Sequence, residues 1–304
     1  MGKLHNLISI HDLDRELIDL ILKTAEDMES VAVKRSNELE NKIMAALFFE
    51  PSTRTRLSFE SAMLRLGGKV LGFADVVTTS AGGKGETLAD TIRTVERYAD
   101  IIVMRHPLDG SARVAAEFSS IPIINAGSGA EEHPTQALLD LYSIKKMKGT
   151  IDGLSISLCG DLRYGRTVHS LGIALAYYDV NITLAAPPSL RMQPAIVEEM
   201  RKSGMNVEEV DTVDEAIKGA DVVYMTRIQK ERFPDVREYT AVKGKFRISS
   251  SDVARMKGDS IILHPLPRVD ELDASVDSTP QAQYFDQVYN GVVTRMAILK
   301  LILG

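Results

Sequence analysis

Short runs of β-branched and other apolar residues alternate along the chain with longer segments whose apolar residues recur every three or four positions. The short runs have the length and composition of buried strands, and the longer ones have the period of helices. We predict strands over residues 43–49, 70–74, 101–105, 122–125, 154–158, 182–185, 222–226 and 261–263. We predict helices over residues 57–66, 86–98, 135–147, 167–177 and 194–202. This alternation predicts an α/β fold of two doubly wound domains, each a mostly parallel sheet flanked by helices on both faces.

Residues that favour helix ends mark several of these boundaries. Gly67, Gly68 and Gly149 follow predicted helices, while Asp12 and Asp14 precede a further apolar stripe of helical spacing. Glycine commonly closes a helix, and aspartate commonly caps its first turn. A last apolar helix over residues 292–303 can belong to either half of the chain on its pattern alone.

The length predicts two domains. The chain has 304 residues, whereas a single hydrophobic core stops growing near about 250–300 residues and most domains have about 100–150. No linker rich in proline, glycine or serine marks the boundary. We place it near His133 and Pro134, so that residues 1–134 form the first domain and residues 135–289 the second.

Composition and charge exclude several classes of protein. The chain is 44% hydrophobic and 26% charged, as in an ordinary globular protein, and its formal net charge of -6 opposes broad binding to nucleic acid. No apolar run reaches the roughly 20 residues that span a bilayer, and the N-terminus lacks the apolar core of a signal peptide. We therefore expect a cytoplasmic protein that binds neither membrane nor nucleic acid. Cys159 is the only cysteine, and no cysteine–histidine cluster has zinc-ligand spacing, so we expect neither a disulfide nor a metal.

Arginines gather where a ligand would bind. In open α/β sheets, ligands lie at the carboxyl ends of the strands. The last residue of the predicted strands or the segments that follow them contain Arg54, Arg56, Arg105, Arg163, Arg166, Arg227 and Arg268. On a chain of net negative charge, this local enrichment predicts a small, strongly anionic substrate.

The most specific of these signals is the segment Ser52-Thr53-Arg54-Thr55-Arg56. Its hydroxyls, its two guanidinium groups and the free backbone N–H groups of a starting helix offer many donors to one anion. We predict a phosphate-binding cradle here. The alternative is a serine or threonine helix cap followed by surface arginines, which a lone serine-to-arginine spacing would favour.

Two glycine-containing segments each allow two interpretations. Lys84 lies between Gly83 and Gly85, so it belongs either to a mobile loop that closes over an anion or to a solvated turn. Four residues separate Gly160 from Gly165. Because this spacing lacks the Gly-x-Gly turn of a dinucleotide fingerprint, nucleotide binding is the weaker alternative there.

A proline-containing segment, His264-Pro265-Leu266-Pro267-Arg268, follows the last predicted strand. Its two prolines remove two backbone N–H donors and leave carbonyl groups free to accept from an amide. The alternative is a rigid loop that binds nothing.

With these motifs the chain resembles the aspartate and ornithine carbamoyltransferase family over essentially its whole length. Residues 49–56 resemble the family's carbamoyl phosphate signature, residues 133–136 its second motif and residues 264–268 its third. Ser80, Lys84 and the His-Pro-Leu-Pro-Arg segment look like the aspartate branch, whereas ornithine enzymes usually have a cysteine at the position of Pro265. The resemblance implies a carbamoyl phosphate-binding domain, an aspartate-binding domain and a C-terminal helix over residues 290–304 that returns to the first.

The resemblance also implies an activity. Such an enzyme transfers the carbamoyl group of carbamoyl phosphate to the α-amino group of L-aspartate, giving N-carbamoyl-L-aspartate and phosphate. This transfer is an early step of de novo pyrimidine (UMP) biosynthesis, and we expect it to need no cofactor. The resemblance further implies a homotrimer with shared active sites, and it leaves open whether separate regulatory chains bind.

The site residues follow from the same resemblance. Carbamoyl phosphate would be bound by Ser52, Thr53, Arg54, Thr55, Arg105, His133, Gln136, Pro265 and Leu266, with Ser80 and Lys84 from a neighbouring chain. Aspartate would be bound by Lys84, Arg166, Thr167, Arg227 and Gln229. The catalytic members of the set would be Arg54, Thr55, Lys84, Arg105 and His133.

Two other functions compete with this one. The nearest is a carbamoyltransferase for another amine, such as ornithine. Arg166 and Arg227 would repel the extra ammonium group of ornithine and would pair with the second carboxylate of aspartate. The other is a non-enzymatic anion-binding or regulatory protein, against which Arg105, His133 and Gln136 argue because they would do more than hold phosphate.

Overall fold

The computed structural model describes the chain except for residues 1–3, 75–78, 80–83, 229–239, 241–243 and 245. It divides into two compact units, unit 1 with Met1–Tyr142 and Tyr289–Gly304, and unit 2 with Ser143–Val288. Helices α6 (Pro134–Lys148) and α12 (Tyr284–Leu303) each contribute residues to both units. The domain boundary after residue 134 stays a prediction.

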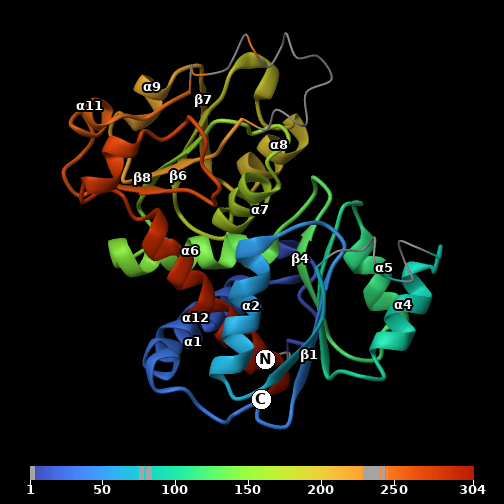
Figure 1. The fold of residues 1–304 in the computed structure, drawn as a ribbon. Coiled ribbons are helices and arrows are strands. Elements are labelled where there is room, and N and C mark those ends of the chain that lie inside the picture. Colours follow the sequence, from blue (N-terminus) through green and yellow to red (C-terminus); the bar gives the residue numbers. More distant parts are fainter. Residues whose placement is uncertain (1–3, 75–78, 80–83, 229–239, 241–243, 245) are drawn as a thin grey trace. The chain divides into compact units, whose positions relative to one another are not determined.

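Unit 1 is built on a parallel sheet of four strands in the order β2-β1-β3-β4. These strands are β1 (Ile43–Phe48), β2 (Lys69–Phe73), β3 (Ile101–His106) and β4 (Ile123–Ser128). Among the described residues, the helices of this unit besides parts of α6 and α12 are η1 (Ile10–Asp12), α1 (Arg15–Lys34), α2 (Thr53–Arg65), α4 (Leu88–Val95) and α5 (Ser111–Phe118). Figure 1 shows α4 and α5 on one side of this sheet and α1 and α2 on the other.

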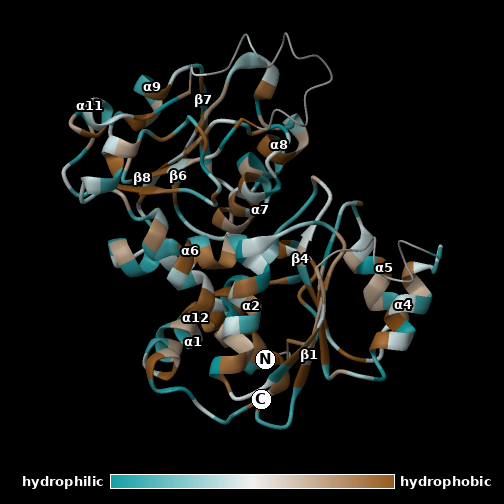
Figure 2. Cartoon of the chain, viewed as in Figure 1, coloured by the Kyte–Doolittle hydropathy of each residue, from teal (hydrophilic) through white to brown (hydrophobic). Residues whose placement is uncertain are grey.

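The strands of unit 1 are apolar on both faces. Ala45, Leu47 and Ile102 pack with Ile92 of α4 and Ala112 of α5 in one core. Alternate residues of a strand point to opposite faces, so the intervening residues are buried under the helices of the other layer. Figure 2 shows the strands of this sheet largely in the brown of hydrophobic residues. A sheet covered on both faces gives the continuous apolar runs from which the strands are predicted.

Helix ends agree with the predicted capping residues at most positions. Asp14 begins α1, and its side chain accepts a hydrogen bond from the N–H of Leu17 at 2.8 Å. Asp12, in contrast, does not begin that helix, because it forms a capping box with Ser9 around η1. Gly149 follows α6 with a φ of 80°, a left-handed conformation that glycine adopts without a steric cost.

Unit 2 is built on a parallel sheet of five strands in the order β7-β6-β5-β8-β9. These strands are β5 (Ser155–Cys159), β6 (Asn181–Ala185), β7 (Asn206–Val210), β8 (Val222–Met225) and β9 (Ile261–Leu263). The helices within the described part of this unit, besides parts of α6 and α12, are α7 (Arg166–Leu175), η2 (Pro188–Leu190), α8 (Pro194–Lys202), α9 (Val213–Ile217), α11 (Ser250–Val253) and η4 (Ala274–Ser278). Figure 1 shows α7 and α8 on one side of the sheet and α9 and α11 on the other.

The predicted fold class is confirmed, although the pattern missed some short elements. Strand β7 pairs only with β6 at an edge of the sheet, and in its sequence NVEEV only Val207 is buried. Helix α5 buries the small residues Ala112 and Ala115, so it has no stripe of large apolar residues. Elements that bury little apolar surface carry a weak periodic signal.

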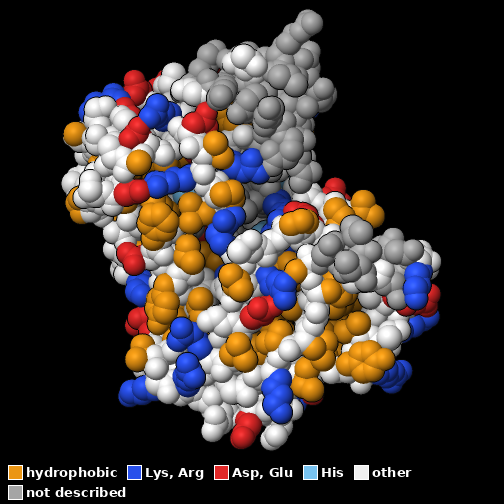
Figure 3. Space-filling model, in the orientation of Figure 1, with side chains coloured by type: hydrophobic (Ala, Val, Ile, Leu, Met, Phe, Trp, Pro, Cys, Tyr) orange, Lys and Arg blue, Asp and Glu red, His pale blue; other side chains and the backbone are white. Residues whose placement is uncertain are grey.

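The surface and the single thiol add little chemistry of their own. On the face drawn in Figure 3, lysine and arginine side chains are interspersed with aspartate and glutamate. Within the described residues, no helix is long and apolar enough to cross a membrane, and no group of histidine, cysteine, aspartate and glutamate side chains could hold a metal ion. Cys159 is buried, and burial raises the pKa of its thiol to about 12. A thiol with so high a pKa is a weak nucleophile at neutral pH.

Candidate active site

The predicted phosphate cradle and Arg105 start from neighbouring strands of unit 1. Phe48 at the end of β1 is paired in register with Arg105 of β3. The N–H of Phe49 donates to the carbonyl oxygen of Arg105 at 2.8 Å. Because parallel strands end at the same edge of a sheet, the segment that leaves β1 begins beside Arg105.

The predicted cradle forms the start of α2. Ser52 is the N-cap residue, yet its side chain makes no capping hydrogen bond. Thr55 is buried, whereas Arg54 is exposed. Arg56 pairs with Glu60 one turn later, with 2.6 Å between Nε and Oε1. Arg56 therefore fits the alternative of a surface arginine, while Ser52, Arg54 and the first N–H groups of the helix fit an anion site.

Arg105 is held by a carboxylate that the sequence did not reveal. Its Nη2 donates to Oε1 of Glu50 at 2.7 Å, and the two side chains are 14% and 25% exposed. At this depth the pair is screened less than a surface pair. The Nε of Arg105 is buried and has no hydrogen-bond partner within the described part of the chain. Buried donors are normally satisfied, so this guanidinium has donor capacity left for a ligand oxygen.

A neutral histidine lies next to this pair. Burial lowers the pKa of His106 against the opposing charge of Glu50. Its Nδ1 accepts a hydrogen bond from the N–H of Leu108 at 3.1 Å, and its ring lies 5.0 Å from the ring of Phe49. At neutral pH His106 therefore adds no positive charge beside Arg105.

The second motif lies at the start of α6. His133, Thr135 and Gln136 are 3%, 0% and 8% exposed. The carbonyl oxygen of His133 accepts from the N–H of Gln136 at 3.0 Å, so His133 directly precedes the helix. The Nε2 of Gln136 donates to Oδ1 of Asp140 at 2.9 Å. The motif is thus a buried polar group at a helix N-terminus, where a partial positive charge favours oxygen atoms of a ligand.

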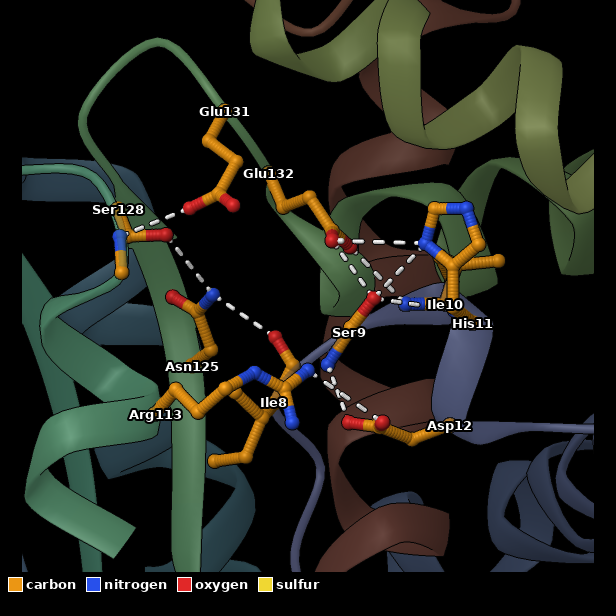
Figure 4. A network of polar contacts seen from close by, with 11 residues as sticks. Ile8, Ser9, Ile10, His11, Asp12, Arg113, Asn125, Ser128, Glu131 and Glu132 are labelled. Carbon is orange, nitrogen blue, oxygen red and sulfur yellow. Dashed lines mark hydrogen bonds and ion pairs between the residues drawn. The ribbon is translucent and has the colours of Figure 1, made fainter. Parts of the chain in front are cut away.

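A network of polar contacts anchors the residue before His133 (Figure 4). Glu132 accepts from the Ser9 hydroxyl at 2.6 Å and from the N–H of Ile10 at 3.0 Å. The N-terminal segment therefore holds the connection between β4 and α6. The sequence missed this role because Ser9 and Glu132 are 123 positions apart, and no local pattern links them.

In unit 2, the two predicted aspartate-binding arginines follow neighbouring strands. Arg166 begins α7 after β5, Arg227 follows β8, and both are half-buried. A Cβ atom on Gly160 would lie 2.2 Å from the carbonyl oxygen of Thr226, and Gly160 has a φ of 111°. The Oγ1 of Thr226 also accepts from the N–H of Asp161 at 3.1 Å. Glycine is therefore required at position 160 by this close approach of the two strand ends, a requirement unrelated to a nucleotide.

Buried hydrogen bonds hold the turn that carries Pro265 and Leu266. The N–H of Leu266 donates to Nδ1 of His264 at 2.8 Å, which places the ring proton on Nε2. This Nε2 donates to Oε1 of Glu271 at 2.7 Å, and both side chains are almost fully buried. Leu266 has a φ of 55°, which is strained for a residue with a side chain. Within the described residues, the carbonyl oxygens of Pro265 and Leu266 accept no protein hydrogen bond.

The described part of the chain contains most of the predicted site residues. Unit 1 holds Ser52, Thr53, Arg54, Thr55, Lys84, Arg105, His133 and Gln136. Unit 2 holds Arg166, Thr167, Arg227, Pro265 and Leu266. Ser80 and Gln229 lie outside the described residues, and Lys84 is exposed. The structure adds Glu50, Asp140 and Glu271, none of which was predicted as a site residue.

Known proteins resemble this chain over its whole length. Models of the aspartate/ornithine carbamoyltransferase carbamoyl-P binding domain and Asp/Orn binding domain match residues 5–146 and 152–302. The aspartate carbamoyltransferase catalytic subunit of Thermococcus onnurineus is 55% identical over 302 residues, which cover 98% of this chain and 97% of that one.

Two solved structures share the fold. The catalytic subunit of M. jannaschii aspartate transcarbamoylase is 49% identical, with a TM-score of 0.91 over 98% of both chains. The aspartate transcarbamoylase of Trypanosoma cruzi in complex with carbamoyl phosphate and aspartate is 40% identical, with a TM-score of 0.94 over 99% of this chain and 98% of that one. From both domain models and these full-length relatives, the chain belongs to the aspartate/ornithine carbamoyltransferase family.

Proposed function

We propose that this chain transfers the carbamoyl group of carbamoyl phosphate to the α-amino group of L-aspartate, releasing N-carbamoyl-L-aspartate and phosphate. The observation that carries this proposal is the 55% identity, over 98% of the chain, to an aspartate carbamoyltransferase catalytic subunit. A relative of 40% identity forms a complex with the same two substrates. The reaction is an early step of de novo pyrimidine biosynthesis, and we place it in the cytoplasm.

The start of α2 binds the phosphate end of carbamoyl phosphate. Ser52, Thr53 and Thr55 offer hydroxyls, Arg54 offers a guanidinium, and the first turn of α2 offers N–H groups. Arg105 joins them through the donors that Glu50 does not occupy. Several preorganised donors on one phosphate stabilise the charge that builds on it as the bond to the carbamoyl carbon breaks.

Donors also stabilise the carbonyl oxygen of the carbamoyl group. Thr55, Arg105 and His133 donate to this oxygen, which becomes negative when the tetrahedral intermediate forms. The amino group of the same substrate has only N–H donors, so it needs acceptors. Gln136 Oε1 and the carbonyl oxygens of the turn at residues 265–266 supply them.

The bond changes balance without a cofactor. The neutral α-amine of aspartate attacks the carbamoyl carbon, a C–N bond forms, and the C–O bond to phosphate then breaks. The departing phosphate takes the proton of the amine, so the reaction consumes no side-chain base. Catalysis then consists of positioning the two substrates and of stabilising the charge that develops on them.

Half-buried arginines determine which amino acid accepts the carbamoyl group. Arg166, Thr167, Arg227 and Gln229 bind the two carboxylates of aspartate, together with Lys84. Guanidinium groups pair with carboxylates through two parallel hydrogen bonds. Ornithine has an ammonium group where aspartate has its second carboxylate, so the same arginines disfavour ornithine.

The active site is shared between chains of a homotrimer, with Ser80 and Lys84 coming from the neighbouring chain. The relatives are named catalytic subunits, which supports separate regulatory chains as partners. Sharing predicts that two inactive variants, Arg54→Ala and Lys84→Ala, complement each other when trimers are dissociated and reassembled together. Equal random mixing restores about a quarter of the wild-type activity, because about three quarters of trimers are mixed and each contains one intact site. A mixture as inactive as its parents argues against shared sites.

The activity itself is tested with the purified chain. Carbamoyl phosphate is supplied with either aspartate or ornithine, and release of phosphate and formation of the carbamoylated amino acid are measured together. We expect both products with aspartate and only the background hydrolysis with ornithine. Faster turnover with ornithine, or no turnover with either amine, contradicts the proposal.

A further inference from the structure

Two buried side chains of unit 1, Arg295 and Asp140, interact electrostatically. Arg295 of α12 and Asp140 of α6 are 3% and 0% exposed. Burial lowers the pKa of Arg295 to about 10, and the negative charge of Asp140 opposes this shift, so the guanidinium stays charged at neutral pH. The Nη1 of Arg295 donates to Oγ of Ser58 in α2 at 2.9 Å. A buried charge is costly unless it is paired, so the pair needs a reason beyond stability.

Helix α12 is adapted to this guanidinium. A Cβ atom on Gly291 would lie 2.7 Å from Nη1 of Arg295 and 3.1 Å from Cδ2 of Leu139. The same Nη1 donates to the carbonyl oxygen of Gly291 at 3.2 Å, and the guanidinium carbon lies 5.0 Å from the centre of the Phe59 ring. The position of Arg295 between α2 and α6 is therefore closely determined.

Asp140 also accepts a hydrogen bond from a predicted substrate-binding residue. The Nε2 of Gln136 donates to Oδ1 of Asp140 at 2.9 Å. An ionised carboxylate can only accept hydrogen bonds, so the NH2 group of Gln136 must face it. Since Asp140 is fully buried, water does not compete for this bond. The carbonyl oxygen of the Gln136 amide is then the group that remains for a ligand.

We propose that Asp140, through its hydrogen bond to Gln136, orients the side-chain amide of that residue and thereby makes the site specific for an acyl phosphate with an amino group. Asp140 is a positioning residue in this arrangement, because it touches Gln136 and no substrate atom. The inference rests on the proposed function, in which Gln136 accepts from the carbamoyl amino group. A reversed amide would present N–H donors to the N–H donors of carbamoyl phosphate.

The orientation of Gln136 sets how well the site rejects the nearest analogue. Acetyl phosphate has the charge and shape of carbamoyl phosphate but carries a methyl group in place of the amino group. A site built to hydrogen-bond a substrate group rejects the analogue that lacks it, because its own polar group is then left unpaired. A site with a freely turning amide loses most of this discrimination.

The test is the Asp140→Asn variant of the full-length chain. Arg295 has only donors, so it attracts the Oδ1 of the new asparagine and leaves its NH2 group facing Gln136. The Gln136 amide then flips, so that its NH2 group instead of its carbonyl oxygen faces the ligand. We measure dissociation constants for freshly dissolved carbamoyl phosphate and for acetyl phosphate by titration calorimetry. We expect the ratio of the two constants to fall by about tenfold, which equals about 1.4 kcal/mol.

A second variant covers the case in which Asp140→Asn does not fold. The double variant Asp140→Leu with Arg295→Met replaces both charges by apolar side chains of similar size, a change that is often neutral for stability. The Gln136 amide of this double variant has no fixed partner, so the ratio of the two dissociation constants also falls. A ratio that stays at the wild-type value in the folded variants overturns the proposal, even if both affinities weaken, because a purely structural role lowers both alike.

Wild-type turnover separates this inference from the proposed function. A wild-type chain that does not carbamoylate aspartate refutes the proposed function, and the inference with it. A wild-type chain that is active, alongside folded variants that keep their discrimination, refutes only the role of Asp140.

Discussion

Replacing Glu271 by glutamine tests whether one buried carboxylate holds the turn after β9. Its Oε1 accepts from Nε2 of His264 at 2.7 Å, and its Oε2 accepts from the N–H groups of Val269 and Asp270 at 3.1 Å each. A glutamine can keep the first bond only by presenting its NH2 group to the two backbone donors. If the glutamine amide flips, its NH2 group faces the Nε2 donor of His264 instead, and that hydrogen bond is lost.

The expected loss follows from the number and the exposure of these donors. An unsatisfied buried donor costs about 1–3 kcal/mol. The Val269 residue is 71% exposed, so its N–H can turn to water and costs little. We therefore expect a loss of about 2 kcal/mol, which lowers the Tm by about 4–8 °C in a protein of this size class.

The assay is thermal unfolding of Glu271→Gln beside a matched control. Asp270→Asn makes the same carboxylate-to-amide change one residue away, at a half-buried side chain. The KM for carbamoyl phosphate should rise in Glu271→Gln alone, because the carbonyl groups of residues 265–266 lose their support. If Glu271→Gln is as stable as Asp270→Asn, the carboxylate does not hold the turn and the reasoning is refuted.

The same variant predicts a pH dependence. Burial acts to raise the pKa of Glu271, but hydrogen bonds from His264 and from the backbone outweigh it and lower the pKa below 4.5. A carboxyl with a depressed pKa adds stability that is present above its unfolded pKa and is lost as the pH falls through its folded pKa. Glutamine does not titrate. The stability gap between wild type and Glu271→Gln should therefore be constant near neutral pH and narrow below pH 4.5, as measured by urea unfolding.

Three further substitutions address two proposed binding residues and the glycine that packs against the end of β8. Arg54→Ala should lower kcat by on the order of 10² to 10³ with an unchanged Tm, since it removes one preorganised donor to the phosphate; a variant that keeps about half of the wild-type kcat would place Arg54 outside the site. Arg227→Ala should lower kcat/KM for aspartate about 10- to 100-fold while carbamoyl phosphate still binds in calorimetry, and a collapse of carbamoyl phosphate affinity contradicts its assignment. Gly160→Ala should lower the free energy of unfolding by about 2–4 kcal/mol and raise the aspartate KM, because the new Cβ would displace Thr226 and Arg227, which follows it. If the free energy of unfolding and the KM are both unchanged, the strand ends can separate freely.

The local motifs were open to prediction because they depend on short segments. Alternating apolar runs and helical stripes indicated two parallel sheets with helices on both faces, and the observed sheets confirm this fold class. Hydroxyls and arginines after a strand pointed to the start of α2 as an anion site. Gly160 is the instructive exception. Its spacing to Gly165 suggested a nucleotide only weakly, and the structure gives the residue a packing reason instead.

The groups that orient the predicted site residues came only from the tertiary structure. Glu50 against Arg105, Asp140 against Gln136, and Glu271 against His264 are contacts without any sequence motif. The sequence by itself determined the fold class and most of the longer elements, since capping and periodicity act within a few residues. Which carboxylate meets which donor was decided by the packing of elements such as α2, α6 and α12. Arg295 reaches Ser58 across 237 positions of sequence, and such a contact exists only once helices from both ends of unit 1 share one buried layer.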